Sequence, residues 1–440
     1  MLYNKNKIFK FTDYYDLNSK FVKQEYYVLN GECVHNDDNE PALIKYYYPK
    51  SKYDVYGNVK LKLYYYNGEC YKEIKYYDCE NETLMQETYF HNNRIHRLEN
   101  DKPALINYYP EGNIKSEMYF MNGNLHRVAD TEGRVADTEG RVADTEGRVA
   151  DTEGRVADKP ATIRYRKNGE IKYHAYYVNG ELYREDKPAY IEYYSSRECD
   201  GSKIKSEHYY LNNKLHRGVV IEDHRSDTES KPSVIKYYPN GLIQHELYYK
   251  DNKIHRDNNL PAKIFYRTCG AIMCQAYAIN GCIHNDNGPA HIEYYPSGNI
   301  KIIMYYKYNK CNNFFDTKDC KIKPAYIKYS EDGNVLKEKY MINNQLHRGV
   351  VIEDCETTTE GSEAQDCEAE DCDKPAYIKY SEDGYILKEK YCVNGIYKRT
   401  NIDDPTIIEY NNNGNDVVNV YTDKYGNQLR REIELSIWTK

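Results

Sequence analysis

The stretch Asp101–Arg127 reads DKPALINYYPEGNIKSEMYFMNGNLHR and contains two alternating segments. Residues 103–109 and 114–120 both place similar residues at every second position, which is the pattern of a β-strand. Asn122 and Gly123 supply the positive φ angles of a tight hairpin turn. Proline lacks the donor that a strand ladder needs, so we expect Pro103 at the first residue of its strand. The predicted faces are Ala104, Ile106 and Tyr108 in the first strand, and Ile114, Ser116, Met118 and Phe120 in the second.

The same pattern recurs along the chain with a period near 28 residues. Lys231–Arg256 and Gly288–Tyr306 are further copies, and the shortest spacings between motif prolines are 28 and 29 residues. About eleven units cover nearly all 440 residues, so we expect one elongated all-β array of antiparallel hairpins in place of several domains. We assign 1–25 to an N-terminal cap, 26–420 to the array and 421–440 to a C-terminal cap. The motif prolines are Pro41, Pro103, Pro160, Pro188, Pro232, Pro261, Pro289, Pro324, Pro375 and Pro405.

Three expanded loops, at 128–155, 218–231 and 349–373, all follow the same point of the repeat. The first contains four identical copies of VADTEGR. The spacing from Pro103 to Pro160 is 57 residues, and subtracting the 28 residues of the four copies leaves 29, a normal period. We therefore interpret this segment as an insertion into a loop, where extra length costs little closure entropy. Its Gly in every heptad and its lack of separate a and d positions exclude a coiled coil, so we expect a solvated, disordered loop.

The acidity of the chain is concentrated in one of these loops. Residues 349–373 carry ten Asp or Glu and no Lys or Arg, while the whole chain has a net charge of −8, so the remainder is +2. This distribution does not predict a nucleic-acid-binding protein. A solvated loop is the simplest interpretation. The alternatives are an acidic docking segment, or a cation site that uses Cys355, Cys367 and Cys372.

Two polar positions recur in the repeats, one occupied by His and one by Glu. One His per unit could suggest a metal ladder, but no second ligand follows at close spacing, and Tyr183 and Tyr397 replace His in two units. We expect instead a stack of polar contacts in which Glu faces Arg or His across strands. We therefore predict no catalytic, cofactor-binding or metal-binding residues. The two series are His35, His96, His126, His216, His255, His284 and His347, and Glu87, Glu117, Glu207, Glu246, Glu338 and Glu389.

The hairpins with the sequence Tyr-Tyr-x-Asn-Gly, such as Tyr26–Gly31, Tyr176–Gly180 and Tyr391–Gly395, resemble those of MORN-repeat variants. The longer form, with His-Arg before Pro-Ala, is similar to multicopy repeat proteins of giant amoebal DNA viruses. The chain departs from standard MORN units because it lacks their Gly-x-Trp core, and its single Trp, Trp438, lies outside the array. The resemblance implies a scaffold or interaction role and offers no catalytic residues.

Composition and motifs favour contact over catalysis. The chain has 52 Tyr, 8 Phe and 1 Trp, and Tyr suits a half-buried sheet face. No nucleotide-binding or hydrolase motif occurs. We therefore predict a scaffold or protein-interaction protein with a protein partner and no cofactor. A carbohydrate-binding or hydrolytic protein that uses the Tyr-rich face and a structural virion component remain as alternatives.

Location is predicted from what the sequence lacks. Residues 1–20 contain no apolar run of signal-peptide length, and no segment is apolar enough to cross a membrane. A peripheral membrane contact has no support in the sequence. The 13 cysteines are scattered, without a CxxC pair, which favours reduced thiols. We expect a cytoplasmic protein, in a host cytoplasm or a virion if it is viral.

Overall fold

In the structure, a computed structural model, about half of the described residues form β-strands. Within the described residues no helix occurs, which confirms the expected all-β array of antiparallel hairpins. Contacts divide the chain into two units, Met1–Arg217 with Pro239–Gly241, and Gly218–Tyr238 with Leu242–Lys440. The predicted cap boundaries stay predictions. The described ranges are 8–16, 20–29, 31–33, 40–50, 54–66, 68–99, 101–127, 159–184, 187–199, 204–211, 213–217, 231–316, 321–348, 373–411 and 414–433.

In the first unit each long strand pairs with the next long strand in the chain, always antiparallel. Two short strands, β3 (Glu32–Cys33) and β8 (Arg94–Ile95), fold back on β2 and β7. The long strands are β1 (Phe9–Tyr14), β2 (Val22–Leu29), β4 (Leu43–Tyr46), β5 (Val59–Tyr66), β6 (Glu69–Tyr76), β7 (Leu84–His91), β9 (Leu105–Tyr108), β10 (Ile114–Met118), β13 (Thr162–Tyr165), β14 (Ile171–Ala175), β17 (Tyr190–Tyr193) and β18 (Ile204–His208).

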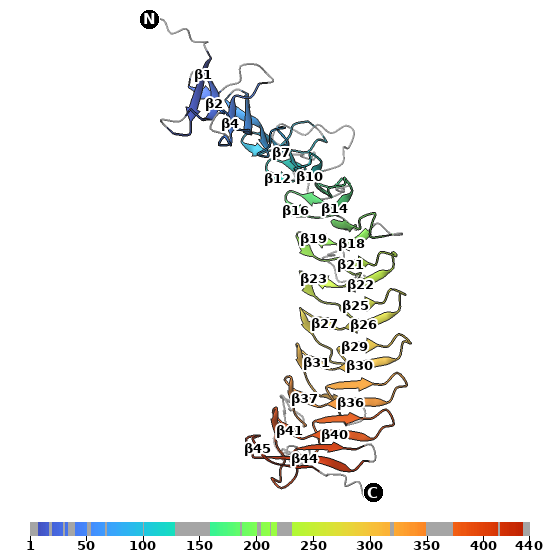
Figure 1. Cartoon of the computed structure of the whole chain (residues 1–440). Helices are drawn as coiled ribbons and strands as arrows, with labels where there is room; N and C mark the ends of the chain where they lie inside the picture. Colours follow the sequence, from blue (N-terminus) through green and yellow to red (C-terminus); the bar gives the residue numbers. More distant parts are fainter. Residues whose placement is uncertain are drawn as a thin grey trace, which may run out of the picture. The chain divides into compact units, whose positions relative to one another are not determined.

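The second unit follows the same rule and ends on a strand without the repeat pattern, β45. Figure 1 shows its hairpins stacked in chain order. The long strands are β21 (Val234–Tyr237), β22 (Ile243–Leu247), β25 (Lys263–Tyr266), β26 (Ile272–Ala276), β29 (His291–Tyr294), β30 (Ile300–Met304), β35 (Tyr326–Tyr329), β36 (Val335–Lys339), β39 (Tyr377–Tyr380), β40 (Ile386–Lys390), β43 (Ile407–Tyr410), β44 (Asp416–Thr422) and β45 (Gln428–Ile433).

Most repeats carry a second, smaller hairpin after the long one. In the second unit these small hairpins form a column beside the long hairpins (Figure 1). One further hairpin, β33 (Phe314–Asp316) with β34 (Lys321–Lys323), lies between two repeats. The small hairpins are β11 (Phe120–Met121) with β12 (Asn124–Leu125), β15 (Tyr177–Val178) with β16 (Glu181–Leu182), β19 (Tyr210–Leu211) with β20 (Lys214–Leu215), β23 (Tyr249–Lys250) with β24 (Lys253–Ile254), β27 (Ala278–Ile279) with β28 (Cys282–Ile283), β31 (Tyr306–Lys307) with β32 (Lys310–Cys311), β37 (Met341–Ile342) with β38 (Gln345–Leu346), and β41 (Cys392–Val393) with β42 (Ile396–Tyr397).

The small hairpins correct the prediction of two strands per repeat. The expected second strand, 114–120, ends at Met118, and Phe120 belongs to β11, which pairs with β12. The break falls at Tyr119, whose N–H donates to the Ala161 carbonyl of the next repeat while its own carbonyl accepts the His126 N–H. The predicted position of Pro103 is also slightly wrong, because β9 begins at Leu105.

The turns form as the sequence predicts. Asn122 and Gly123 have φ angles of 50° and 88°, the left-handed pair that a tight two-residue hairpin turn needs. At the other end of the long hairpin, Gly112 has a φ of 92° and the strand register shifts between Ile114 and Ser116. This bulge sets which side chains of β9 and β10 lie opposite each other.

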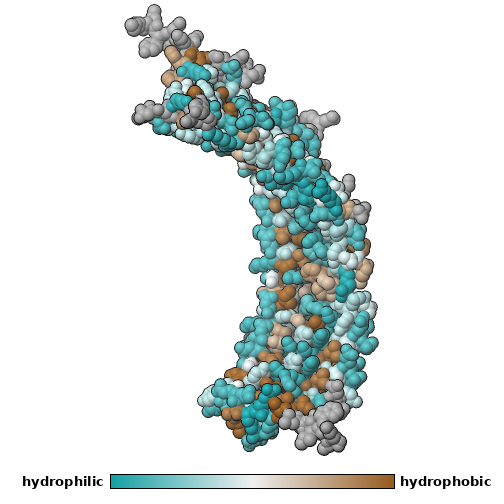
Figure 2. Space-filling view, in the orientation of Figure 1, coloured by the Kyte–Doolittle hydropathy of each residue, from teal (hydrophilic) through white to brown (hydrophobic). Residues whose placement is uncertain are grey.

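The residue that follows each motif proline is buried, and it is Ala at eight of the ten positions and Ser233 or Thr406 at the other two. Ala104, Ala161, Ala262 and Ala376 are fully buried, at the point where the long hairpin meets the column of small hairpins. Ala262 packs with Tyr248 and with Ala278 of the next small hairpin. On the face shown in Figure 2, hydrophobic side chains are interspersed with hydrophilic ones, consistent with a mean hydropathy of −0.92.

Candidate functional site: the loop station

An arginine lies where one repeat connects to the next. We call this connection the loop station and define it as the residues from the Arg position after the small hairpin to the Pro-Ala of the following repeat. In seven described repeats the guanidinium lies over the ring of the Tyr eight residues earlier, a cation–π contact. The centroid distances are 3.9 Å for Arg97–Tyr89, 3.6 Å for Arg127–Tyr119, 3.9 Å for Arg184–Tyr176, 3.7 Å for Arg217–Tyr209, 3.7 Å for Arg256–Tyr248, 3.4 Å for Arg348–Tyr340 and 4.0 Å for Arg399–Tyr391.

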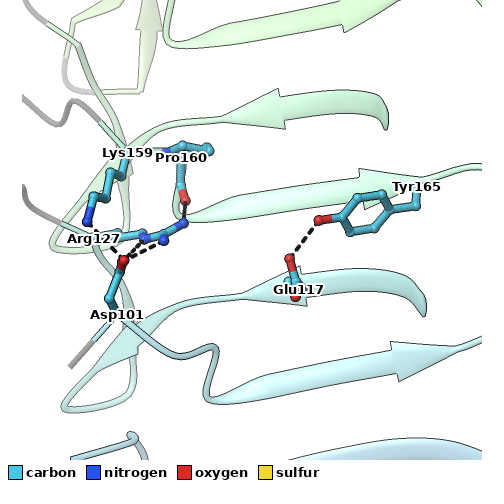
Figure 3. Close-up of polar contacts among 6 residues, drawn as sticks. All are labelled: Asp101, Glu117, Arg127, Lys159, Pro160 and Tyr165. Atoms are coloured by element: carbon cyan, nitrogen blue, oxygen red, sulfur yellow. Dashed lines mark hydrogen bonds and ion pairs between the residues drawn. The ribbon is translucent and has the colours of Figure 1, made fainter. Parts of the chain in front are cut away.

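The same arginine also binds the start of the next repeat. Arg127 Nη1 donates to the Pro160 carbonyl at 3.1 Å, and its Nε and Nη2 donate to Asp101 Oδ1 at 3.0 and 2.6 Å (Figure 3). Lys159 Nζ contacts the other oxygen of Asp101 at 2.9 Å. These bonds, led by that from Arg127, hold the pKa of the Asp101 carboxyl below its ordinary value, because they favour the charged form.

The contact is independent of the length of the loop that it closes. Arg256 Nη1 donates to Pro261, five residues away, at 3.0 Å, whereas Arg127 reaches Pro160 across 33 residues. Subtracting the 28 residues of the VADTEGR copies from 33 leaves five. Arg348 makes the same bond to Pro375 across 27 residues, at 3.2 Å. The same hydrogen bond from Arg to the proline carbonyl therefore joins the ends of the long segments and the ends of the short loop.

The loop station tolerates other residues in place of Arg. Asn285 replaces it after His284, and its Nδ2 donates to the Pro289 carbonyl at 3.0 Å. After Asn312 the position is Asn313, and Phe314 stacks on the Tyr305 ring at 4.8 Å. Thus Asn285 bonds the proline carbonyl in one repeat, and Phe314 contacts the tyrosine ring in the other.

The histidines connect successive small hairpins. His96 Nδ1 accepts the backbone N–H of Asn122 in the next turn at 3.1 Å, and His255 accepts that of Asn280 at 3.0 Å. The same bond joins His126 to Asn179 and His347 to Asn394. His284 differs, because its ring stacks on Tyr308 at 4.2 Å. Its Nε2 contacts Asp286 at 3.1 Å, as that of His255 contacts Asp257.

No group of three potential metal-ligating side chains occurs in the part of the chain that the structure describes. Most of the predicted insertions lie outside the described residues, at 128–158, 218–230 and 349–372, as do Cys355, Cys367 and Cys372 and the single Trp438. The expectation that these loops are solvated therefore stays a prediction.

The glutamates have partners other than those predicted. Glu117 Oε2 accepts the hydroxyl of Tyr165 from the next repeat at 2.7 Å (Figure 3), so the expected pairing of Glu with Arg or His is wrong. The same bond joins Tyr46 to Glu25, Tyr108 to Glu87, Tyr266 to Glu246, Tyr380 to Glu338 and Tyr410 to Glu389.

Burial and the neighbouring carboxylate raise the pKa of these tyrosines, and Tyr391, which also bonds to Glu389, reaches about 12. Tyr108 and Tyr165 shift in the same direction, with burial as the largest cause. The hydroxyls therefore remain protonated donors at neutral pH.

The tyrosine that follows forms a further ladder between repeats. Tyr109 Oη donates to the Tyr165 carbonyl at 2.9 Å, and Tyr238 donates to the Tyr266 carbonyl at 2.8 Å. Arg166 and Arg267 replace the tyrosine in two repeats, and each still donates to the equivalent carbonyl, that of Tyr193 or Tyr294, at 2.6 Å. The hydroxyls are thus used in contacts between repeats.

One cleft of about 230 Å³ lies in the second unit, between the loop stations that follow His255 and His284. His255 Nε2 contacts Asp257 at 2.8 Å. This bond holds the pKa of the Asp257 carboxyl below its ordinary value. The cleft therefore presents a carboxylate bonded to a histidine, and the contact between His284 and Asp286 repeats this pair.

The fold and the loop stations define a β-hairpin repeat protein whose repeats are joined by side-chain contacts. No protein-family model matches the sequence, and no curated protein matches it. No part of the chain that the structure describes forms a helix long and apolar enough to cross a membrane.

Comparison with solved structures returns chains of low sequence identity and low TM-score. Two crystal structures, of TcdB2-TccC3-TEV and of TcdB2-TccC3, have 10% and 9% identity, TM-scores of 0.13 and 0.14, and cover 96% and 95% of this chain. The Photorhabdus luminescens Tc holotoxin pore, in a mutant of TccC3, has 8% identity, covers 93% of this chain and has a TM-score of 0.11. The chain spans 18%, 19% and 18% of those chains. These scores carry no argument about function.

Proposed function

We propose that the chain is a non-catalytic repeat protein that binds a protein partner through the loops at its loop stations. The observation that carries this proposal is the constant contact between Arg and the proline carbonyl, made across five or 33 residues. Because the same contact closes short and long loops, the loops can vary in length without changing the packing of the hairpins. In repeat proteins such insertions often form the binding face.

The acidic loop, residues 349–373, is the proposed contact for a basic partner. Its ends are held by the bond from Arg348 to Pro375, and its ten acids form the largest block of one charge in the sequence. Such binding weakens with salt, because exposed charges are screened beyond about 8–10 Å.

Partner recovery from the native host tests the proposal. The variant replaces the ten acids of 349–373 with Ser or Asn, and recovery is compared at low and moderate salt. We expect the wild-type chain to retain a basic protein that the variant loses. Equal recovery in both conditions would exclude this loop as the contact.

A catalytic role is the second candidate, because the cleft beside His255 and His284 contains two carboxylates. Both acids are exposed, with side-chain exposures of 65% for Asp257 and 72% for Asp286, and both are bonded to the histidine of their own repeat. A hydrolase screen of the purified chain is expected to find no turnover. Turnover that disappears in Asp257→Asn or Asp286→Asn would contradict a non-catalytic role.

A carbohydrate-stacking role has less support from the geometry. Tyr119 and Tyr248, for example, are covered by Arg127 and Arg256, so these rings are occupied by contacts within the repeat. We further infer, from the Tyr-Tyr-x-Asn-Gly hairpins alone, that the chain is a MORN-repeat variant. A viral origin, with a place in the host cytoplasm or the virion, is part of the same proposal.

A further inference from the structure

Six lysines lie together on one face of four adjacent strands in the second unit. Lys328 of β35 is paired in register with Lys337 of β36, which is paired with Lys379 of β39, which is paired with Lys388 of β40. Lys339 and Lys390 occupy the next row of the same face, where they alternate with Tyr326 and Tyr377. We call these residues the lysine ladder: Lys328, Lys337, Lys339, Lys379, Lys388 and Lys390.

The ladder places like charges side by side. Neighbouring strands are about 4.8 Å apart, and like charges directly opposite each other are destabilising. Only Lys388 has a carboxylate partner among the described residues, Glu409 on β43. Burial, followed by the charges of Lys337 and Lys390, lowers the pKa of Lys339. Apart from Lys388, the ladder therefore carries positive charge without a carboxylate partner in the part of the chain that the structure describes.

The fold does not require lysine at these positions. In the first unit the equivalent row contains Gln86, Asn107 and Ser116, which form a chain of hydrogen bonds at 2.9 Å. In an earlier repeat of the second unit Phe265 is paired with Cys274. Side chains with an amide, a hydroxyl, a ring or a thiol occupy these paired positions in other repeats. The lysines therefore add positive charge that the packing of the strands does not need.

The tyrosines of the ladder are covered by the ammonium groups. Lys339 Nζ lies 5.0 Å from the Tyr326 ring centroid, and Lys390 and Lys337 lie 5.4 and 5.8 Å from that of Tyr377. Single-stranded nucleic acids are bound by rings on which bases stack, and these rings are occupied. The face offers ammonium groups in rows, which suits carboxylates on an extended chain.

We propose that the lysine ladder binds an acidic polypeptide segment in an extended conformation. In such a segment, carboxylates at alternate positions point to one side about 6.8 Å apart, close enough to contact lysines of neighbouring strands. The proposal rests on the proposed function as a protein-binding repeat array, and it adds the chemistry of one partner. It concerns a different surface from the acidic loop, with the opposite charge.

Binding of a fluorescent oligo-glutamate peptide to the full chain tests the proposal. The variant is Lys337→Gln with Lys379→Gln, the two central lysines of the ladder. The matched control is Lys253→Gln with Lys310→Gln, which removes the same charge from exposed positions in small hairpins. We expect the ladder variant to weaken binding by about tenfold or more and the control by less than about twofold.

Three further measurements complete the test. Added salt is expected to weaken the binding of peptide to the wild-type chain. Neutralising the ten acids of 349–373 is expected to maintain or strengthen it, because that segment has the composition of a competing ligand. Thermal melting is expected to show the ladder variant at least as stable as the wild type, because removing like charges relieves repulsion.

Equal weakening by both double variants, or by neither, would overturn the proposal. Tighter binding of an oligothymidylate of the same charge than of the peptide would also overturn it, in favour of a nucleic-acid site. The test is separate from that of the proposed function. Recovery of a host partner that is unchanged in the ladder variant would leave the interaction role standing and exclude the ladder as its site.

Discussion

Replacing Arg127 with methionine removes the contact that closes the longest described loop station. Methionine keeps much of the apolar stem of the side chain but loses the guanidinium. Three interactions disappear: the stack on Tyr119 at 3.6 Å, the bond to the Pro160 carbonyl at 3.1 Å, and the pair with Asp101. The side chain of Arg127 is only 13% exposed, so little water replaces these partners.

The expected loss of stability follows from the individual contacts. The cation–π stack contributes about 0.5–2 kcal/mol, and a hydrogen bond from a charged donor about 1.5–3 kcal/mol. The pair with Asp101 is discounted to about 0.5 kcal/mol, because that carboxylate is 41% exposed and screened by solvent. These contributions are not fully additive, so we expect a decrease of about 2–4 kcal/mol in the free energy of unfolding.

Urea denaturation followed by far-UV circular dichroism measures this change. Arg197→Met is the control, because Arg197 lies exposed in a turn and a substitution there is expected to change stability by less than about 0.5 kcal/mol. A double-mutant cycle with Tyr119→Leu isolates the stack, with an expected coupling of about 0.5–2 kcal/mol. A loss below about 0.5 kcal/mol in Arg127→Met, equal to the control, would refute the view that this arginine holds the repeats together.

Three other changes test the same structure. Deleting Val128–Arg155 is expected to leave a cooperative melt, because Val156–Asp158 still connects Arg127 to Pro160; loss of the cooperative transition would place the insertion in the core. Stability is expected to fall as the pH rises above about 10, the ordinary Tyr pKa. Burial raises the pKa of Tyr89 and Tyr391 to about 12 in the folded chain, so folding favours the protonated hydroxyls and loses this contribution as they ionise. A melting temperature that stays constant through this pH range would contradict the prediction. Ala262→Leu is expected to cost about 1–3 kcal/mol by overpacking, since Ala262 is fully buried, and denaturant unfolding at wild-type stability would contradict that packing.

Local features of the fold could be predicted from the sequence because they depend on residues near one another in the chain. Asn122–Gly123 specifies its turn through backbone conformation alone. The spacing of the prolines revealed the insertion, and the structure confirms the consequence: Tyr165 reaches Glu117 across 48 residues, which is 20 after subtraction of the 28 inserted residues, the separation of Tyr266 from Glu246.

Contacts between repeats do not follow from the sequence of one repeat, because they depend on strand register. The bulge between Ile114 and Ser116 shifts the pairing, and this shift decides which side chains meet across strands. The alternation of the sequence alone predicts Arg or His as the partner of Glu117, whereas the structure places the Tyr165 hydroxyl there. The constant spacing of eight residues between Tyr119 and Arg127, repeated in other units, was a visible signal of the stack.

The lysine ladder was also hidden in the sequence. Lys337 and Lys379 are 42 residues apart, and only the pairing of β36 with β39 brings them together. The overall charge of −8 obscured a positive face, because net charge does not show where charges lie. A map of each strand onto its two faces would have found it.

The second unit is a stack of equivalent hairpins, and we expect each hairpin to be able to pair with any other. Deleting residues 261–288 removes one whole period, joins Leu260 to Pro289, and brings Tyr294 to the position where Tyr266 meets Glu246. Circular dichroism with thermal melting should show a strand-rich chain that melts cooperatively, whereas deletion of half a period should not fold. A full-period deletion that unfolds, or a half-period deletion that melts as the wild type does, would contradict the equivalence of the hairpins.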